Sequence, residues 1–195
     1  LHQFTPRNGI PTIVNTDNAS RSNEAQREVR YEHTREFPGI LAQLRCSLLV
    51  STYQAGKLVV VSSHDGRLIL SFHNFEQAMG IAIHRKRIAI GSRSQIWFLR
   101  STPSVASQAE PCGTHDACYL TRASHFTEDI HGHEMAWCGD ELWLVNTRFS
   151  CLCTRDDEHS FVPRWRPPFI TALAPEDRCH LNGLAIHQGR PRFVT

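Results

Sequence analysis

The chain has 195 residues, of which 41% are hydrophobic and 21% charged, and its formal net charge is +2. This length allows a buried core, while the near-neutral charge without a basic run gives no electrostatic case for binding nucleic acid. No apolar stretch reaches the roughly 18 residues that a membrane helix needs, so we expect no membrane span and no membrane partner.

Residues 1–36 are polar and rich in turn formers, and they predict a flexible N-terminal arm ahead of a folded region at 37–195. The first segment of that region, Phe37–Leu44, fits two structures. It could be the inner strand of a first blade, but Ile40, Leu41 and Leu44 also fit one face of a short helix. We favour the helix.

Short β-strands joined by tight turns are predicted for most of the remaining chain, because Trp, Leu, Val, Ile and Thr favour a pleated surface. In chain order the expected strands are Leu48–Ser51, Lys57–Val61, Gly66–Phe72, Gly80–Ile83, Ile88–Ser92, Gln95–Leu99, Ala117–Phe126, Glu134–Trp137, Leu142–Asn146, Cys151–Thr154, Gly183–Ile186 and Pro191–Thr195. The segment Ser160–Ile170 contains two adjacent prolines, so it predicts an edge strand or an exposed loop.

Three of these segments share one pattern: a central alanine, then a four-residue turn, then a second strand without a gap. They are Gly80–Ile83, Glu134–Trp137 and Gly183–Ile186. The repeats can be aligned on one equivalent position in each copy. These positions are Ser51, Ser92, Asn146 and Thr195, and they are separated by 41, 54 and 49 residues. A period of roughly 40–50 residues with four strands is typical of β-propeller blades. The alternative is a set of unrelated meanders in a sandwich or barrel.

The pattern therefore predicts an all-β fold, a β-propeller fragment of about three to four four-stranded antiparallel blades. The expected blades are approximately 37–75, 76–130 and 131–178, and 179–195 would begin the next one. The central alanines fit this architecture because the innermost strands of a propeller crowd its axis. Since the chain starts with Leu and stops within an expected strand, we expect the full-length parent to be longer.

The seven cysteines are odd in number and lack the spacing of a disulfide framework. Cys151 and Cys153 alternate along one expected strand, so their side chains face the same way, which is a poor geometry for bonding to each other. We therefore expect reduced thiols and a cytoplasmic location.

The strongest candidate site lies where the inner strands enter the axial channel. The residues three positions before the central alanines should occupy equivalent places around one ring, and they are Met79, His133 and Asn182. Hydrogen-bonded polar residues that simply plug the channel mouth would give the same pattern.

Residues beside this ring suggest a metal site. His131 and His133 are two apart, so on an extended chain both face the same way, as two metal ligands could. Together with Glu134 and Asn182 they could hold Zn²⁺, or Ca²⁺ with more oxygen donors. In that case Glu134 or His180 would be the candidate general base.

Two further groups are candidate ligand-binding residues. Arg164, Trp165 and Arg166 could stack on a sugar or base and bind a phosphate or carboxylate, or the tryptophan could pack between blades while the arginines stay solvated. Arg148 follows a second strand, where it could bind an anion or stabilise a turn.

Long motifs in this chain resemble a mainly bacterial family of conserved hypothetical proteins with propeller-like repeats, sometimes found alongside tetratricopeptide segments. The blocks that carry the resemblance are Leu49–Leu58, His133–Thr154, Ser160–Ile170 and Ala174–Ala185. The resemblance covers residues 37–195 and implies that this chain is similar to the N-terminal half of such proteins, with more blades after Thr195. It implies no activity. Separately, the short segment Asn182–Ala185 resembles the strand opening of six-bladed gluconolactonase-type lactonases, which place metal ligands at this level.

These observations predict a scaffold that binds a small molecule or a protein on the face bearing the inner-strand entrances. The alternative is a metal-dependent, lactonase-like hydrolase with Zn²⁺ or Ca²⁺ at the channel mouth.

Overall fold

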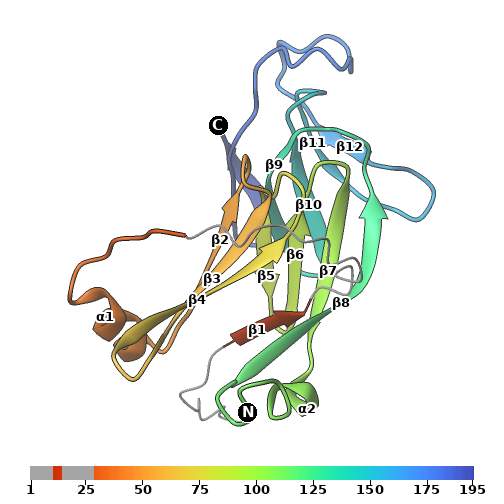
Figure 1. The fold of residues 1–195 in the computed structure, drawn as a ribbon. Helices are drawn as coiled ribbons and strands as arrows, with labels where there is room; N and C mark the ends of the chain where they lie inside the picture. Colours follow the sequence, from red (N-terminus) through yellow and green to blue (C-terminus); the bar gives the residue numbers. More distant parts are fainter. Residues whose placement is uncertain (1–10, 15–28) are drawn as a thin grey trace. The chain divides into compact units, whose positions relative to one another are not determined.

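The structure, a computed structural model, describes residues 11–14 and 29–195. It consists mainly of short β-strands with two short helices (Figure 1), which confirms the predicted all-β class. The chain divides into two compact units. Unit 1 takes in the described residues up to Val50 together with Val59–Asn74 and Ser101–Thr121, and unit 2 consists of Ser51–Leu58, Phe75–Arg100 and Arg122–Thr195.

The predicted helix is present as α1 (Phe37–Leu44), so the alternative of an inner strand at this place was wrong. Pro38 lies in its first turn, where a missing backbone N–H costs nothing. Of the three residues expected to form its apolar face, only Leu41 is buried, and Ile40 and Leu44 are exposed. The second helix, α2 (Pro103–Ala106), is a single turn.

The strands form four sheets (Figure 1). The first has the order β1 (Pro11–Val14), β8 (Ala117–Phe126), β7 (Gln95–Ser101), β6 (Arg87–Gly91) and β5 (Ile81–His84). The second has the order β12 (Val162–Trp165), β11 (Cys151–Thr154), β10 (Glu141–Asn146) and β9 (Gly132–Cys138). The other two are β2 (Leu48–Thr52), β3 (Lys57–His64) and β4 (Arg67–Asn74), and the pair β13 (Leu184–His187) and β14 (Arg190–Val194).

The predicted strands are thus found at their expected places, with ends that shift by a few residues. The expected turns are also present, each as the loop of a β-hairpin. The last cross-strand pairs before these loops are His84 with Arg87, Cys138 with Glu141, and His187 with Arg190. The two-residue loops begin with a residue of positive φ, namely Arg85, Gly139 and Gln188. Such primed turns match the right-handed twist of the flanking strands. β12 lies at the edge of its sheet, as predicted for part of Ser160–Ile170. Pro163 lies within this strand and the two adjacent prolines follow it, and proline is tolerated at such an edge.

Side-chain alternation along β10 divides the core of unit 2 into two layers. Leu142 and Leu144 pack with residues of β5, β6 and β7 on one face of their sheet. Val145 packs on the other face, with Leu181 and Leu184. The sheet β9–β12 is therefore covered on both faces by neighbouring sheets of the same unit.

Three strands of unit 2 that lie at the edges of three different sheets are neighbours. β9 contacts both β5 and β13, although these three strands belong to different sheets. Gly80, immediately before β5, lies so close to β9 that an added Cβ would be 3.2 Å from Glu134 Cα. Small residues at these positions thus allow the strands to approach one another.

Most of the predicted N-terminal arm lies outside the described residues. Within it, Pro11–Val14 forms β1, paired in parallel with β8, which differs from the expected absence of structure. Its run Thr-Ile-Val is rich in β-branched residues that favour strands. No disulfide joins the seven cysteines, all of which lie in the described part, and Cys151 and Cys153 are buried in the same layer, as predicted. Among residues 11–14 and 29–195, no helix is long and apolar enough to cross a membrane.

Candidate functional site: a histidine-lined pocket

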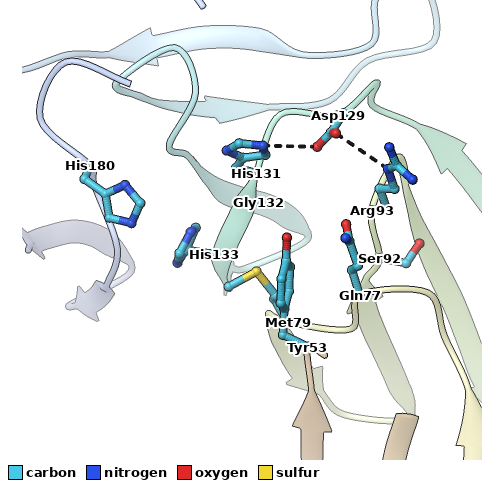
Figure 2. A pocket seen from close by; sticks show the side chains of 10 residues that line it. All are labelled: Tyr53, Gln77, Met79, Ser92, Arg93, Asp129, His131, Gly132, His133 and His180. Carbon is cyan, nitrogen blue, oxygen red and sulfur yellow. Dashed lines mark ion pairs between the residues drawn. The ribbon is translucent and has the colours of Figure 1, made fainter. Parts of the chain in front are cut away.

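Unit 2 contains a pocket of about 390 Å³ (Figure 2). All ten of its lining residues belong to this unit, and they are Tyr53, Gln77, Met79, Ser92, Arg93, Asp129, His131, Gly132, His133 and His180. They come from the β2–β3 turn, the segment before β5, the segment after β6, the segment before β9 together with the first two residues of β9, and the segment before β13. The pocket therefore depends on contacts between parts of the chain that are distant in sequence.

Backbone hydrogen bonds fix the loop before β5 beside the end of β6. The Met79 N–H donates to the Gly91 carbonyl oxygen at 3.1 Å, and the Arg93 N–H donates to the Glu76 carbonyl oxygen at 2.9 Å. Ser92 Oγ donates to the Gln95 carbonyl oxygen and accepts from Trp97 Nε1. These bonds hold the Met79, Ser92 and Arg93 side chains at one wall of the pocket.

Three lining residues have a left-handed backbone although none is glycine: φ is 50° at Gln77, 51° at His131 and 45° at His180. Each such residue costs on the order of 1 kcal/mol and persists only where the surrounding structure imposes it. Seven other non-glycine residues of the described chain share this conformation, including Arg85 and Gln188 in hairpin turns. The left-handed backbone therefore sets the direction of these three side chains and does not by itself mark a functional site.

His133 contacts two residues from the segment before β13. Its Nδ1 lies 3.1 Å from Asn182 Oδ1, and its ring packs edge to face against that of His180, with centroids 5.0 Å apart. Burial lowers the pKa of His133, and the imidazoles of His180 and His131 lower it further, against the opposing effects of Asn182 and Asp177. The neutral imidazole is therefore favoured, with Nδ1–H donating to the amide oxygen.

His180 is oriented by a carboxylate. Its Nδ1 lies 2.7 Å from Asp177 Oδ2, so the Nδ1–H donates and Nε2 is left with its lone pair. Asp177 is itself held by its backbone N–H, which donates to the Arg148 carbonyl oxygen at 2.9 Å. The second oxygen of this carboxylate, Oδ1, is buried without a hydrogen-bond partner.

Ion pairs link His131 to Arg93 across Asp129 (Figure 2). The His131 Nε2 lies 3.6 Å from Asp129 Oδ1, and Arg93 Nε lies 3.6 Å from Asp129 Oδ2. Arg93 also contacts Glu76 at 3.2 Å. Two carboxylates thus surround one guanidinium, so the formal charge of these three groups is −1.

The sequence profile of one protein family, described as "Domain of unknown function (DUF4915)", matches residues 35–195. The chain belongs to this family. The matched range contains every residue of the pocket, and it begins close to residue 37, where the predicted resemblance begins. Comparisons with curated proteins and with solved structures gave no match.

In this DUF4915 chain the structure brings together most of the predicted channel-mouth residues. Met79 and His133 line the pocket with His131 and His180, and Asn182 reaches it through its hydrogen bond to His133. His131 precedes β9 in a left-handed conformation, so strand alternation does not govern its direction, contrary to the expectation.

Glu134 is placed differently from the prediction. It follows His133 on β9, so strand alternation sends its side chain to the other face, and its Oε1 accepts a hydrogen bond from the Met135 N–H at 2.9 Å. It does not line the pocket. In the described part of the chain, no group of three or more His, Cys, Asp or Glu side chains is arranged to hold a metal ion.

Arg148 braces the walls of the pocket without lining it. Its Nη1 donates to the Asp129 carbonyl oxygen at 2.9 Å, and its backbone N–H donates to the Ile130 carbonyl oxygen at 3.1 Å. The Arg148 carbonyl oxygen also accepts a hydrogen bond from the Asp177 N–H. Arg148 therefore connects the segment that carries His131 to the segment that carries His180. This arrangement fits the turn-stabilising alternative better than direct binding of an anion.

Arg164, Trp165 and Arg166 lie on or beside β12 and do not line the pocket. Arg164 pairs with Glu141 and packs over the ring of Trp143, 5.1 Å from its centroid. Trp165 is 44% exposed.

Six lining residues were missed by sequence reasoning: Tyr53, Gln77, Ser92, Arg93, Asp129 and Gly132. All but Gly132, the first residue of β9, lie in turns and loops, where no periodic pattern marks them. Ser92 served only to align the strands, and Tyr53 only as part of a family motif. Gln77 and Asp129 each lie two residues before a predicted site residue, and this proximity was a signal that could have included them.

Proposed function

We propose that this DUF4915 chain forms part of a β-propeller and that it binds a small polar ligand in the histidine-lined pocket. The first strands β5, β9 and β13 would be the inner strands of successive blades, and the pocket would lie at the mouth of the axial channel. The observation that carries the proposal is the convergence of ten residues from separate segments on one pocket of unit 2.

The arrangement of the sheets supports the propeller. β9 contacts β5 and β13 without sharing a sheet with either, and the sheet β9–β12 is covered on both faces. Sheets stacked face to face, with their first strands adjacent, are the arrangement that a radial fold requires.

The lining supports a small polar ligand. Imidazole, hydroxyl, amide and guanidinium groups supply donors and acceptors, while the Met79 side chain and the Tyr53 ring supply apolar contact. At about 390 Å³ the pocket falls within the size range of small-molecule sites.

Ligand-observed NMR against a library of organic acids, amino acids and sugars tests this proposal. Met79→Trp should fill the pocket and abolish binding of any compound found, while Met79→Leu, which keeps the pocket open, should retain it. Compounds that bind the Met79→Trp protein as well as the wild type would overturn the proposal, as would the absence of any binder.

A second candidate is hydrolysis of an ester or lactone, favoured by the hydrogen bond between Asp177 and His180. His180 Nε2 would take a proton from water while the water oxygen bonds to the carbonyl carbon. The carbon–oxygen bond to the leaving group then breaks, and the imidazolium returns the proton to the leaving oxygen. In a metal-assisted form, Zn²⁺ or Ca²⁺ would activate this water, with His131, His133 and Asn182 as the candidate ligands.

Hydrolysis of a lactone panel, with and without added Zn²⁺ or Ca²⁺, tests this candidate. His180→Asn should abolish turnover, and asparagine accepts the left-handed backbone found at this position. The matched control is His159→Asn, because His159 pairs with Asp156 at 2.9 Å with the same sequence separation and lies outside the pocket. No turnover by the wild type under either condition would eliminate this candidate.

A further inference from the structure

The pocket contains a thioether as well as imidazoles. Figure 2 shows the Met79 side chain extending toward His133, with His180 beyond it. The two imidazole rings have centroids 5.0 Å apart. Two imidazoles bound to one ion through nitrogens at about 2.0 Å would place their centroids at a comparable separation. These three side chains are thus close enough to share one small ligand.

Each of the two imidazoles has one nitrogen engaged and one available. His133 Nδ1 contacts Asn182 Oδ1 at 3.1 Å and His180 Nδ1 contacts Asp177 Oδ2 at 2.7 Å, and neither Nε2 forms a hydrogen bond within the described part of the chain. Metal-binding histidines characteristically donate one N–H to a carboxylate or carbonyl oxygen, which fixes the tautomer and leaves the other nitrogen to the metal. His133 and His180 both show this pattern.

The chemical types of these three side chains indicate which metal ion they would bind. Thioether sulfur is a soft ligand that favours Cu(I), and imidazole also suits copper. Zn²⁺ usually takes a closed set of four ligands and Ca²⁺ six to eight oxygens. The one carboxylate among the lining residues, that of Asp129, pairs instead with His131 and Arg93. We propose that Met79, His133 and His180 form a binding site for Cu(I). The site needs neither the propeller architecture nor the binding of an organic ligand.

The chain has only two methionines, Met79 and Met135, and this allows a residue-specific test. Protein labelled with ¹³C at the methionine methyl groups should give two resonances, assigned with Met79→Leu. Cu(I) is added without oxygen to an excess over the seven cysteines, so that thiols cannot hide the site. We expect the Met79 methyl resonance to shift with Cu(I). Met135 packs in one core cluster with Cys151 and Cys153, so its resonance reports folding before Cu(I) is added and binding to those thiols afterwards.

Variants identify the other two ligands. His133→Phe and His180→Asn should each abolish the Met79 shift, and His159→Asn, outside the pocket, should preserve it. Asp177→Asn removes the carboxylate that positions His180 and should weaken Cu(I) binding about 10–100-fold. The Met135 resonance reports folding in every variant, and His133→Gln replaces His133→Phe if that protein does not fold.

An unmoved Met79 resonance in the wild type would overturn the copper site, as would a shift that survives in the His133→Phe and His180→Asn proteins. The proposed binding of small polar molecules has a separate readout. If compounds from the library bind the wild type and not Met79→Trp while Cu(I) leaves Met79 unmoved, the copper inference fails and the proposed function stands.

Discussion

Single residues decide how closely the first strands of unit 2 approach. Gly80 lies against β9, where a Cβ would meet Glu134 Cα and the Met135 side chain at 3.2 Å. The Cβ would also meet the Glu134 carbonyl carbon at 3.2 Å, and backbone atoms cannot rotate away as a flexible side chain can. The missing side chain is therefore a packing requirement rather than a turn requirement.

Gly80→Ala should lower the free energy of unfolding by about 1–3 kcal/mol, as overpacking of a core typically does. Chemical denaturation followed by tryptophan fluorescence measures it. Gly132→Ala is the matched control, because an added Cβ there meets only Ile130, at 3.9 Å, and stability should change by about 0.5 kcal/mol or less. Equal losses for the two variants would contradict the proposed close approach.

A second residue-scale prediction concerns an exposed ion pair. The Arg87 guanidinium, through its hydrogen bond and its charge, lowers the pKa of the Asp140 carboxyl below its usual range. Arg87→Gln should raise the pKa of Asp140 toward the ordinary value, as measured by ¹³C NMR titration of the carboxyl carbons. Arg178→Gln, which breaks a different pair with Glu176, should leave it unchanged.

The sign of the effect on stability follows from linkage. Because the folded state holds the Asp140 proton less tightly than the unfolded chain does, the stabilisation is present above the unfolded pKa. It is lost as pH falls through the lower folded value. The difference in stability between wild type and Arg87→Gln should therefore shrink in acid, and a difference that grows in acid would contradict this assignment.

At the scale of elements, the turn between β10 and β11 anchors the segment that precedes β13. Thr147 is fully buried there, and its hydroxyl donates to the Leu181 carbonyl oxygen. Leu181 packs on Val145 and Leu152, and the next residue, Asn182, contacts His133. One buried hydroxyl thus helps to position residues at the pocket.

Thr147→Val should destabilise the protein by about 1–3 kcal/mol, because it leaves the buried Leu181 carbonyl oxygen without its donor while preserving side-chain shape. Thr147→Ser retains the hydroxyl and should cost less. Thermal unfolding monitored by circular dichroism compares the two. A serine variant as unstable as the valine variant would show that the methyl group, rather than the hydrogen bond, is important here.

The elements themselves were largely predictable from local sequence. Alternation and turn residues located β9 and β10, and the adjacent prolines predicted an edge strand or exposed loop in the segment that contains β12. The apolar face expected on α1 was wrong in part, since Ile40 and Leu44 are exposed. Periodicity shows which residues share a face of a helix, but burial depends on what packs against that face.

At the scale of the whole molecule, the pocket belongs entirely to unit 2. Occupancy of the pocket should therefore slow amide hydrogen exchange in unit 2, chiefly around Met79 and His133, because ligand binding stabilises the closed state of the segments it joins. Exchange in β4, which belongs to unit 1, should stay unchanged. Hydrogen–deuterium exchange mass spectrometry with Cu(I) or a library compound measures this, and uniform protection of both units would contradict it.

The sequence by itself determined the all-β class, the hairpins and the common position of Met79, His133 and Asn182, because these follow from alternation, turn chemistry and spacing along the chain. Only the tertiary structure decided that Glu134 faces away while His180, oriented by Asp177, enters the pocket. It also decided that Tyr53, Arg93 and Asp129 join them. The physical reason is that local patterns fix the direction of a side chain relative to its own strand. Which loops meet, and which left-handed residues turn inward, depends on packing between segments that are distant in sequence.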